Sequence, residues 1–185
     1  MWGNKVPSED RRHEKLKERV ASIFSASGFE TDRTVHIKTS TFETDLDVCA
    51  LYQEVLIVVE CKTGRRIHFD NLLCEWKSKR AEIIAQKDTL SILGSVDKVV
   101  TRQRLKDTKT LKLAIAFHGY ELTHDQVERA RKTEIEVLDS DAIEYYDRTS
   151  RALGQWTKFE IFKEMNIRRR EEEETVAVDA LQLRQ

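Results

Sequence analysis

The sequence predicts an α/β fold in which the strands of a mixed sheet are flanked by helices. Two short apolar runs, 46–51 and 55–61, are joined by a three-residue polar link and predict a β-hairpin. Further along, a strand, a helix, a second strand and a helix follow one another between residues 111 and 147, which is the order of a right-handed βαβ unit. Apolar residues at helical spacing near both ends of the chain predict the remaining helices.

The N-terminal half of the chain predicts two helices around the hairpin. A first helix is expected over about 9–27, because Gly28 stands where helices usually stop. A strand within 29–38 follows it and precedes the hairpin. A long helix is expected over about 69–86. The residues that give the first helix its apolar spacing are Leu16, Val20, Ile23 and Phe24.

The C-terminal half begins with a segment, 88–112, whose pattern fits either one interrupted helix or a loop inserted between core elements. The next elements are a buried strand over 111–117, a helix over about 123–132 that begins at a threonine cap, and a short strand over 135–138. Asp139 then caps another helix. The tail is expected to be helical to about residue 169, with an apolar stripe that packs on the core or on a partner chain.

Composition describes a heavily charged globular protein, with 39% hydrophobic and 35% charged residues and a net charge of −1. The sequence has no apolar run near the roughly 20 residues of a membrane span and no apolar core of a secretory signal, so we expect a cytoplasmic protein. Its three cysteines lack paired CxxC spacing, which argues against a disulfide framework and a zinc site. Cys49 and Cys61 are expected to pack as small apolar residues.

Three ionisable residues interrupt the hairpin: Asp47 in its first strand, and Glu60 and Lys62 at the end of its second. Glu60 and Lys62 share a face because side chains alternate along a strand, and a plain hairpin register brings Asp47 to the same end. Two neighbouring carboxylates repel each other, and a divalent cation such as Mg²⁺ relieves that repulsion. The alternative interpretation is a structural salt bridge between Lys62 and one of the acids.

An Asp followed after twelve residues by Glu-x-Lys on adjoining strands resembles the PD-(D/E)xK nuclease superfamily, and Val58 to Gly64 resembles its Mrr-like restriction-endonuclease branch. The resemblance covers roughly 9–147, although Leu46 stands where the family often has Pro. It implies a restriction-endonuclease-like three-layer fold with a central mixed sheet of about five strands.

The resemblance also implies a metal site. Asp47, Glu60 and the backbone carbonyl of Cys61 would hold Mg²⁺, for which Mn²⁺ can substitute, and Lys62 would orient or activate the attacking water. A glutamate of the first helix often joins such a site, and Glu18 is the candidate here, with Glu14 as the alternative. A solvated Glu18 beside neighbouring lysines fits the sequence equally well.

Basic residues cluster after the motif, and Arg65, Arg66, Lys77 and Arg80 are the candidates for contact with a nucleic acid. Solvated helix faces are the ordinary alternative. The function implied by the resemblance is a Mg²⁺-dependent endonuclease that hydrolyses DNA phosphodiester bonds in restriction, defence or DNA processing. The alternatives are a catalytically inactive nuclease-like module that binds DNA or a partner protein, and cleavage of RNA or branched DNA.

The sequence divides into a nuclease-like core over 9–147, a helical extension over 148–170, and an acidic linker over 171–185 that leads into a further strand or domain. DNA is the expected partner, with no role for a membrane. Many nucleases of this type dimerise, so the apolar stripe of the helical extension is a candidate interface for a homodimer.

Overall fold

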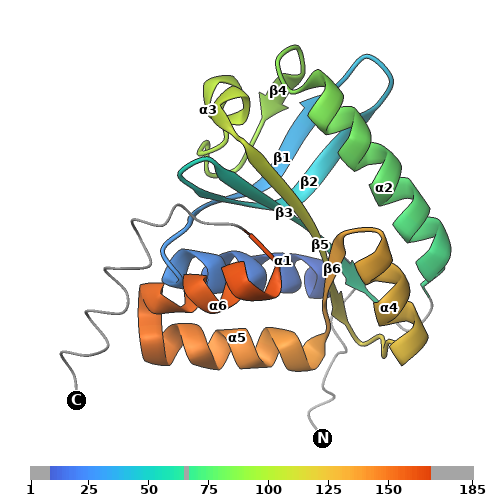
Figure 1. Cartoon of the computed structure of the whole chain (residues 1–185), viewed down its shortest axis with the longest axis vertical. Coiled ribbons are helices and arrows are strands. Elements are labelled where there is room, and N and C mark those ends of the chain that lie inside the picture. Colours follow the sequence, from blue (N-terminus) through green and yellow to red (C-terminus); the bar gives the residue numbers. More distant parts are fainter. Residues whose placement is uncertain (1–8, 65–66, 168–185) are drawn as a thin grey trace, which may run out of the picture.

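The computed structural model describes residues 9–64 and 67–167, in which six strands form one mixed sheet between two layers of helices (Figure 1). The strands are β1 (Glu30–Lys38), β2 (Glu43–Tyr52), β3 (Val55–Thr63), β4 (Ser91–Gly94), β5 (Thr110–His118) and β6 (Ile135–Leu138). The helices are α1 (Glu9–Ala26), α2 (Phe69–Gln86), α3 (Arg102–Asp107), α4 (His124–Lys132), α5 (Ser140–Leu153) and α6 (Thr157–Glu164), with a 3-10 turn (Gly154–Trp156) before α6.

The sheet has the strand order β4-β1-β2-β3-β5-β6. Strand β1 pairs antiparallel with both β2 and β4, and β2 and β3 form the expected antiparallel hairpin. Strands β3, β5 and β6 run parallel to one another, as the strand–helix–strand pattern predicts. The predicted α/β fold with a mixed sheet is therefore confirmed, with six strands in place of about five because β4 adds an edge.

Each face of the sheet is covered by its own apolar cluster, which makes the structure three-layered. On one face, α1, α5 and α6 pack on alternate residues of β2, β3 and β5, and on the other face α2, α3 and α4 pack on the residues between them. Strands buried on both sides read as continuous apolar runs, which is the pattern of residues 55–61. Cys49 and Cys61 are fully buried on opposite faces, as small apolar residues.

Helix α1 ends where the glycine predicts. The amide of Phe29 donates to the carbonyl of Phe24, and the amide of Gly28 donates to that of Ser25, which is the hydrogen-bond pattern of a Schellman motif. Gly28 has a φ of +88°, a conformation that residues with a side chain rarely adopt. The rings of Phe24 and Phe29 meet edge to face at 5.3 Å, which closes the motif with an apolar contact.

The segment over 88–112 contains the short edge strand β4, a loop and the short helix α3, and not one interrupted helix. Its loop is fastened to β1 by Asp32, which is fully buried. The carboxylate of Asp32 accepts hydrogen bonds from the backbone amides of Asp97, Val99 and Val100, at 2.8 to 2.9 Å. A charge fully supplied with amide donors is tolerated in the interior, so this aspartate holds the loop in place.

The two caps predicted in the C-terminal half are present. Thr123 forms a capping box with Gln126 at the start of α4, and the carboxylate of Asp139 accepts the amide of Ala142 at the start of α5. In α6, Ile161 and Phe162 pack into the cluster beneath α1, so the core buries this part of the apolar stripe. The predicted linker and further strand over 171–185 lie outside the described residues.

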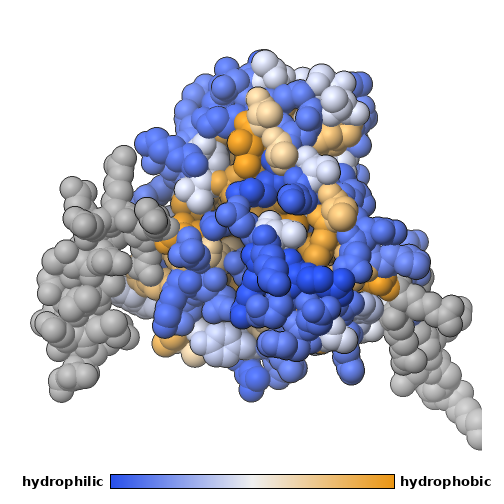
Figure 2. All heavy atoms as spheres, turned by 45° about the vertical axis from the view of Figure 1, so that its right-hand side comes forward, coloured by the Kyte–Doolittle hydropathy of each residue, from blue (hydrophilic) through white to orange (hydrophobic). Residues whose placement is uncertain are grey.

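Polar and charged side chains dominate the face of the molecule shown in Figure 2, and apolar surface appears between them in narrow patches. Such a surface is typical of a protein that meets polar or charged ligands and not an extended apolar partner. Within the described residues, no helix is both long and apolar enough to cross a membrane.

Candidate active site

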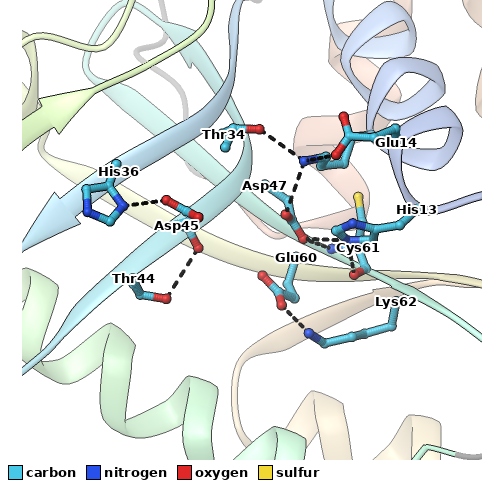
Figure 3. A network of polar contacts seen from close by, with 11 residues as sticks. His13, Glu14, Thr34, His36, Thr44, Asp45, Asp47, Glu60, Cys61 and Lys62 are labelled. Atoms are coloured by element: carbon cyan, nitrogen blue, oxygen red, sulfur yellow. Dashed lines mark hydrogen bonds and ion pairs between the residues drawn. The ribbon is translucent and has the colours of Figure 1, made fainter. Parts of the chain in front are cut away.

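The candidate site lies where β2 and β3 separate. Their paired register ends at Val48 and Val59. The next residues in the same register are Asp47 and Glu60, so the two acids face each other across the point of separation. This is the arrangement that the plain hairpin register predicts, and the sequence motif is therefore assembled at one end of the hairpin (Figure 3).

Side-chain alternation in β2 breaks at Asp47. Cys49 packs into the cluster beneath α2, and Leu46 packs into the same cluster although it lies three positions away. Strand β1 is irregular at the same level, because Thr34, which stands opposite Asp47 in the register, has a φ of 51°. This paired kink turns Asp47 out of the ordinary in-or-out alternation of a strand.

The carboxylate of Asp47 lies between the two strands. Its Oδ2 accepts a hydrogen bond from the backbone amide of Cys61 at 2.8 Å, which is the position that a strand carbonyl fills in a regular ladder. Asp47 is only 7% exposed, so this hydrogen bond satisfies an amide and an acid that are both shielded from water.

Glu60 and Lys62 point to the same face, as predicted, and form an ion pair. Glu60 is 8% exposed. Burial, together with the nearby charge of Asp47, raises the pKa of Glu60 to about 7 against the partial opposition of Lys62. Burial favours the neutral amine of Lys62, but the charge and hydrogen bond of Glu60 outweigh it and raise the pKa of Lys62, so Lys62 is cationic at neutral pH.

Helix α1 brings two further residues to the site that the sequence analysis did not identify. The Nε2 atom of His13 lies 2.9 Å from the carbonyl oxygen of Cys61 and 3.3 Å from Oδ2 of Asp47. The amine of Lys17, one helical turn further on, is buried and lies 3.9 Å from Oδ1 of Asp47. Their spacing of four residues beside the buried Leu16 was the available signal, because it places both on the inner edge of an amphipathic helix.

The glutamates of α1 are placed differently from the prediction. Glu18 forms its ion pair with Arg33 of β1, at 3.9 Å, and its side chain is largely exposed. The structure therefore does not bring Glu18 to Asp47, because position 18 lies about 100° around the helix from Lys17. Glu14 is nearer the site through Lys17, whose amine it contacts at 2.5 Å, and Lys17 also donates to the hydroxyl of Thr34 at 3.0 Å.

The oxygen donors at the site fit a hard divalent cation. Among the described residues, no three His, Cys, Asp or Glu side chains gather closely enough to hold a metal ion by themselves. Asp47, Glu60 and the carbonyl of Cys61 nevertheless offer two carboxylates and one carbonyl, and Mg²⁺ commonly binds one or two carboxylates and keeps several waters. The raised pKa of Glu60 is the cost of two acids without such a cation.

The predicted basic contacts are only partly on one surface. Lys77 is exposed on α2, whereas Arg80 forms an ion pair with Glu134 at 3.1 Å. Arg65 and Arg66 lie outside the described residues. Lys79, on the same helix, donates to the hydroxyl of Thr44 at 3.3 Å, and its charge acts on Glu60.

Comparisons with known proteins show the fold. No protein-family model matches the chain, and no curated protein matches it closely. Among solved structures, Can2 from Sulfobacillus thermosulfidooxidans, in complex with cyclic tetra-adenylate, is similar with 18% identity and a TM-score of 0.50. That match covers 85% of this chain and 37% of Can2.

Protein VC1899 from Vibrio cholerae is also similar, with 19% identity and a TM-score of 0.48 over 83% of this chain. The chain spans 37% of that protein, and thus little more than a third of the length of either neighbour. At this level of identity the likeness concerns the backbone, and the chain shares with Can2 an α/β fold built on a mixed sheet.

Proposed function

We propose that this protein hydrolyses phosphodiester bonds of DNA with the help of a bound Mg²⁺ ion. The observation that carries the proposal is the pairing of Asp47 and Glu60 at the point where two strands separate, with Lys62 held against Glu60. Asp47, Glu60 and the Cys61 carbonyl would hold the ion. When bound, such an ion neutralises charge on the phosphate and makes water a better nucleophile.

The chain's own residues would position the substrate. Lys62 is cationic, because Glu60 raises its pKa, so its amine acts as a hydrogen-bond donor and a positive charge next to the phosphate. His13 contacts both Asp47 and the Cys61 carbonyl and so fixes the orientation of two of the oxygen donors. The buried amine of Lys17 compensates the charge of Asp47 from the other side.

Cleavage of a supercoiled plasmid tests the proposal. Nicking is expected with Mg²⁺ or Mn²⁺ and not with EDTA, and Asp47→Asn or Lys62→Ala should lower the rate by about 100-fold or more. Asp45→Asn is the matched acid control, since this exposed residue of the same strand pairs with His36, and Lys38→Ala is the matched lysine control. Equal rates for Lys62→Ala and the wild type would contradict the mechanism.

A second candidate function is a nuclease-like module that binds without cleaving. It is favoured by the cations that already accompany both acids, Lys17 at Asp47 and Lys62 at Glu60. A rise in the melting temperature with Mg²⁺ in the wild type, absent in Asp47→Asn, would favour the enzyme. DNA binding with no metal-dependent cleavage of DNA, RNA or branched DNA would favour the module.

A further inference from the structure

A cleft of about 190 Å³ lies between α1 and α5 and is lined by basic side chains. Arg12, Lys15 and Arg19 enter it from α1, at spacings of three and four residues that place them on one side of the helix. Its volume is that of about six water molecules, which is ample for a phosphate group. No acidic side chain is among the described residues that line it.

The remaining walls of the cleft also suit an anion. His118 ends β5, and Ser140 is the first residue of α5, a helix whose positive end therefore opens on the cleft. Leu16 and Ile143 supply apolar surface, which excludes water and strengthens the field of the surrounding charges.

The acids nearby are occupied elsewhere or face another way. Asp147 binds Arg19 at 3.1 Å, but it also binds Arg151 at 3.0 Å, so Arg151 retains Asp147 when Arg19 turns toward a ligand. Asp139 uses its carboxylate to cap the amide of Ala142. Asp141 lines a separate hollow beyond Ser140.

The cleft is continuous with the candidate active site. In the sheet, His118 stands opposite Thr63, the residue that follows Lys62. The same helix that supplies Lys15 to the cleft also brings His13 to Asp47. A strand whose phosphate lies at Lys62 would therefore have a neighbouring phosphate within reach of the cleft.

We propose that this basic cleft between α1 and α5 binds a backbone phosphate of the nucleic acid next to the bond that is cleaved. The proposal rests on the proposed function for the identity of the ligand. It assigns the nucleic-acid contact to Arg12, Lys15 and Arg19 of α1 and to His118, in place of the residues of α2 that the sequence suggested.

Binding of a short fluorescent DNA duplex, measured by anisotropy in EDTA so that nothing is cleaved, tests the cleft. Each phosphate contact makes binding weaker by about threefold between 50 and 200 mM salt. Over that range the wild type should therefore lose about threefold more affinity than Lys15→Ala, and about tenfold more than Arg12→Ala/Lys15→Ala. Lys163→Ala, which removes an exposed lysine of α6, is the matched control and should behave as the wild type.

The outcomes separate the two proposals. Lys15→Ala with the affinity and salt dependence of Lys163→Ala overturns the cleft, whether or not the protein cleaves DNA, and so does a wild type that binds no DNA. A weaker salt dependence in Lys15→Ala, with no cleavage by the wild type in Mg²⁺, supports the cleft and contradicts the proposed enzyme. A duplex with and without a terminal phosphate distinguishes the sources, because a backbone site binds both equally.

Discussion

The carboxylate of Asp47 accepts the backbone amide of Cys61 at 2.8 Å, and by this contact one side chain joins two strands that have stopped pairing through their backbones. The same carboxylate raises the pKa of Glu60 through its charge. Asp47 is thus a structural link and half of an acidic pair at once, and variants of Asp47 can separate these two roles.

Replacing Asp47 with alanine should destabilise the protein by about 1–3 kcal/mol, because the buried amide of Cys61 loses its acceptor. Asp47→Asn keeps an acceptor oxygen of the same shape and should cost less than the alanine variant. Urea unfolding of both variants measures the difference. Equal destabilisation by the two would mean that the hydrogen bond is not what Asp47 contributes to stability.

The stability of the protein should depend on pH through Glu60. Its pKa is about 7 in the folded state, against an ordinary value of 4.5. Between these values the folded state binds more protons than the unfolded state, so the free energy of unfolding should fall as pH rises from about 4.5 to 7, by up to about 3 kcal/mol.

Glu60→Gln tests this pH dependence because it removes the titrating group, and its unfolding free energy should lose that slope. Glu121→Gln, an exposed acid of a loop, should keep the slope of the wild type. Added Mg²⁺ should flatten the wild-type curve by favouring the ionised carboxylate. A wild-type stability that rises steadily over this pH range would contradict the burial of an acid at Glu60.

The strands and helices near the site could be predicted because their signals are local. Alternation, the apolar runs and the cap at Asp139 each depend on a few neighbouring residues, and Gly28 marked the end of α1 for a backbone reason. The juxtaposition of Asp47 and Glu60 followed from the hairpin register alone.

The contribution of α1 could not be predicted, because it depends on how the helix is rotated against the sheet. A helix of 18 residues offers several polar positions, and a rotation of one residue exchanges Lys17 for Glu18 at Asp47. The loop before α3 has the same difficulty. Asp32 fixes it from a strand more than sixty residues earlier, and no local pattern records such a contact.

Asp32→Ala should be among the most destabilising single changes in the chain. It leaves the amides of Asp97, Val99 and Val100 without their acceptor, and we expect a loss of about 3–5 kcal/mol in the free energy of unfolding. Asp97→Ala is the matched control, since it removes only an exposed ion pair with Arg33, and it should cost less than about 1 kcal/mol. Thermal and urea unfolding of the two variants should therefore differ clearly, and similar curves would argue against the tether.

Gly28→Ala should destabilise the junction between α1 and β1. At a φ of +88° an alanine is strained, and its Cβ would lie 3.0 Å from the Cβ of Gln155. The expected loss is about 1–2 kcal/mol, measured by urea unfolding. Gly94→Ala is the matched control, because no atom lies within 4 Å of the added methyl group and the backbone of Gly94 is not left-handed, so it should leave stability within about 0.5 kcal/mol of the wild type. If Gly28→Ala unfolds with the wild-type midpoint, the helix does not require the left-handed residue that its terminal hydrogen bonds imply.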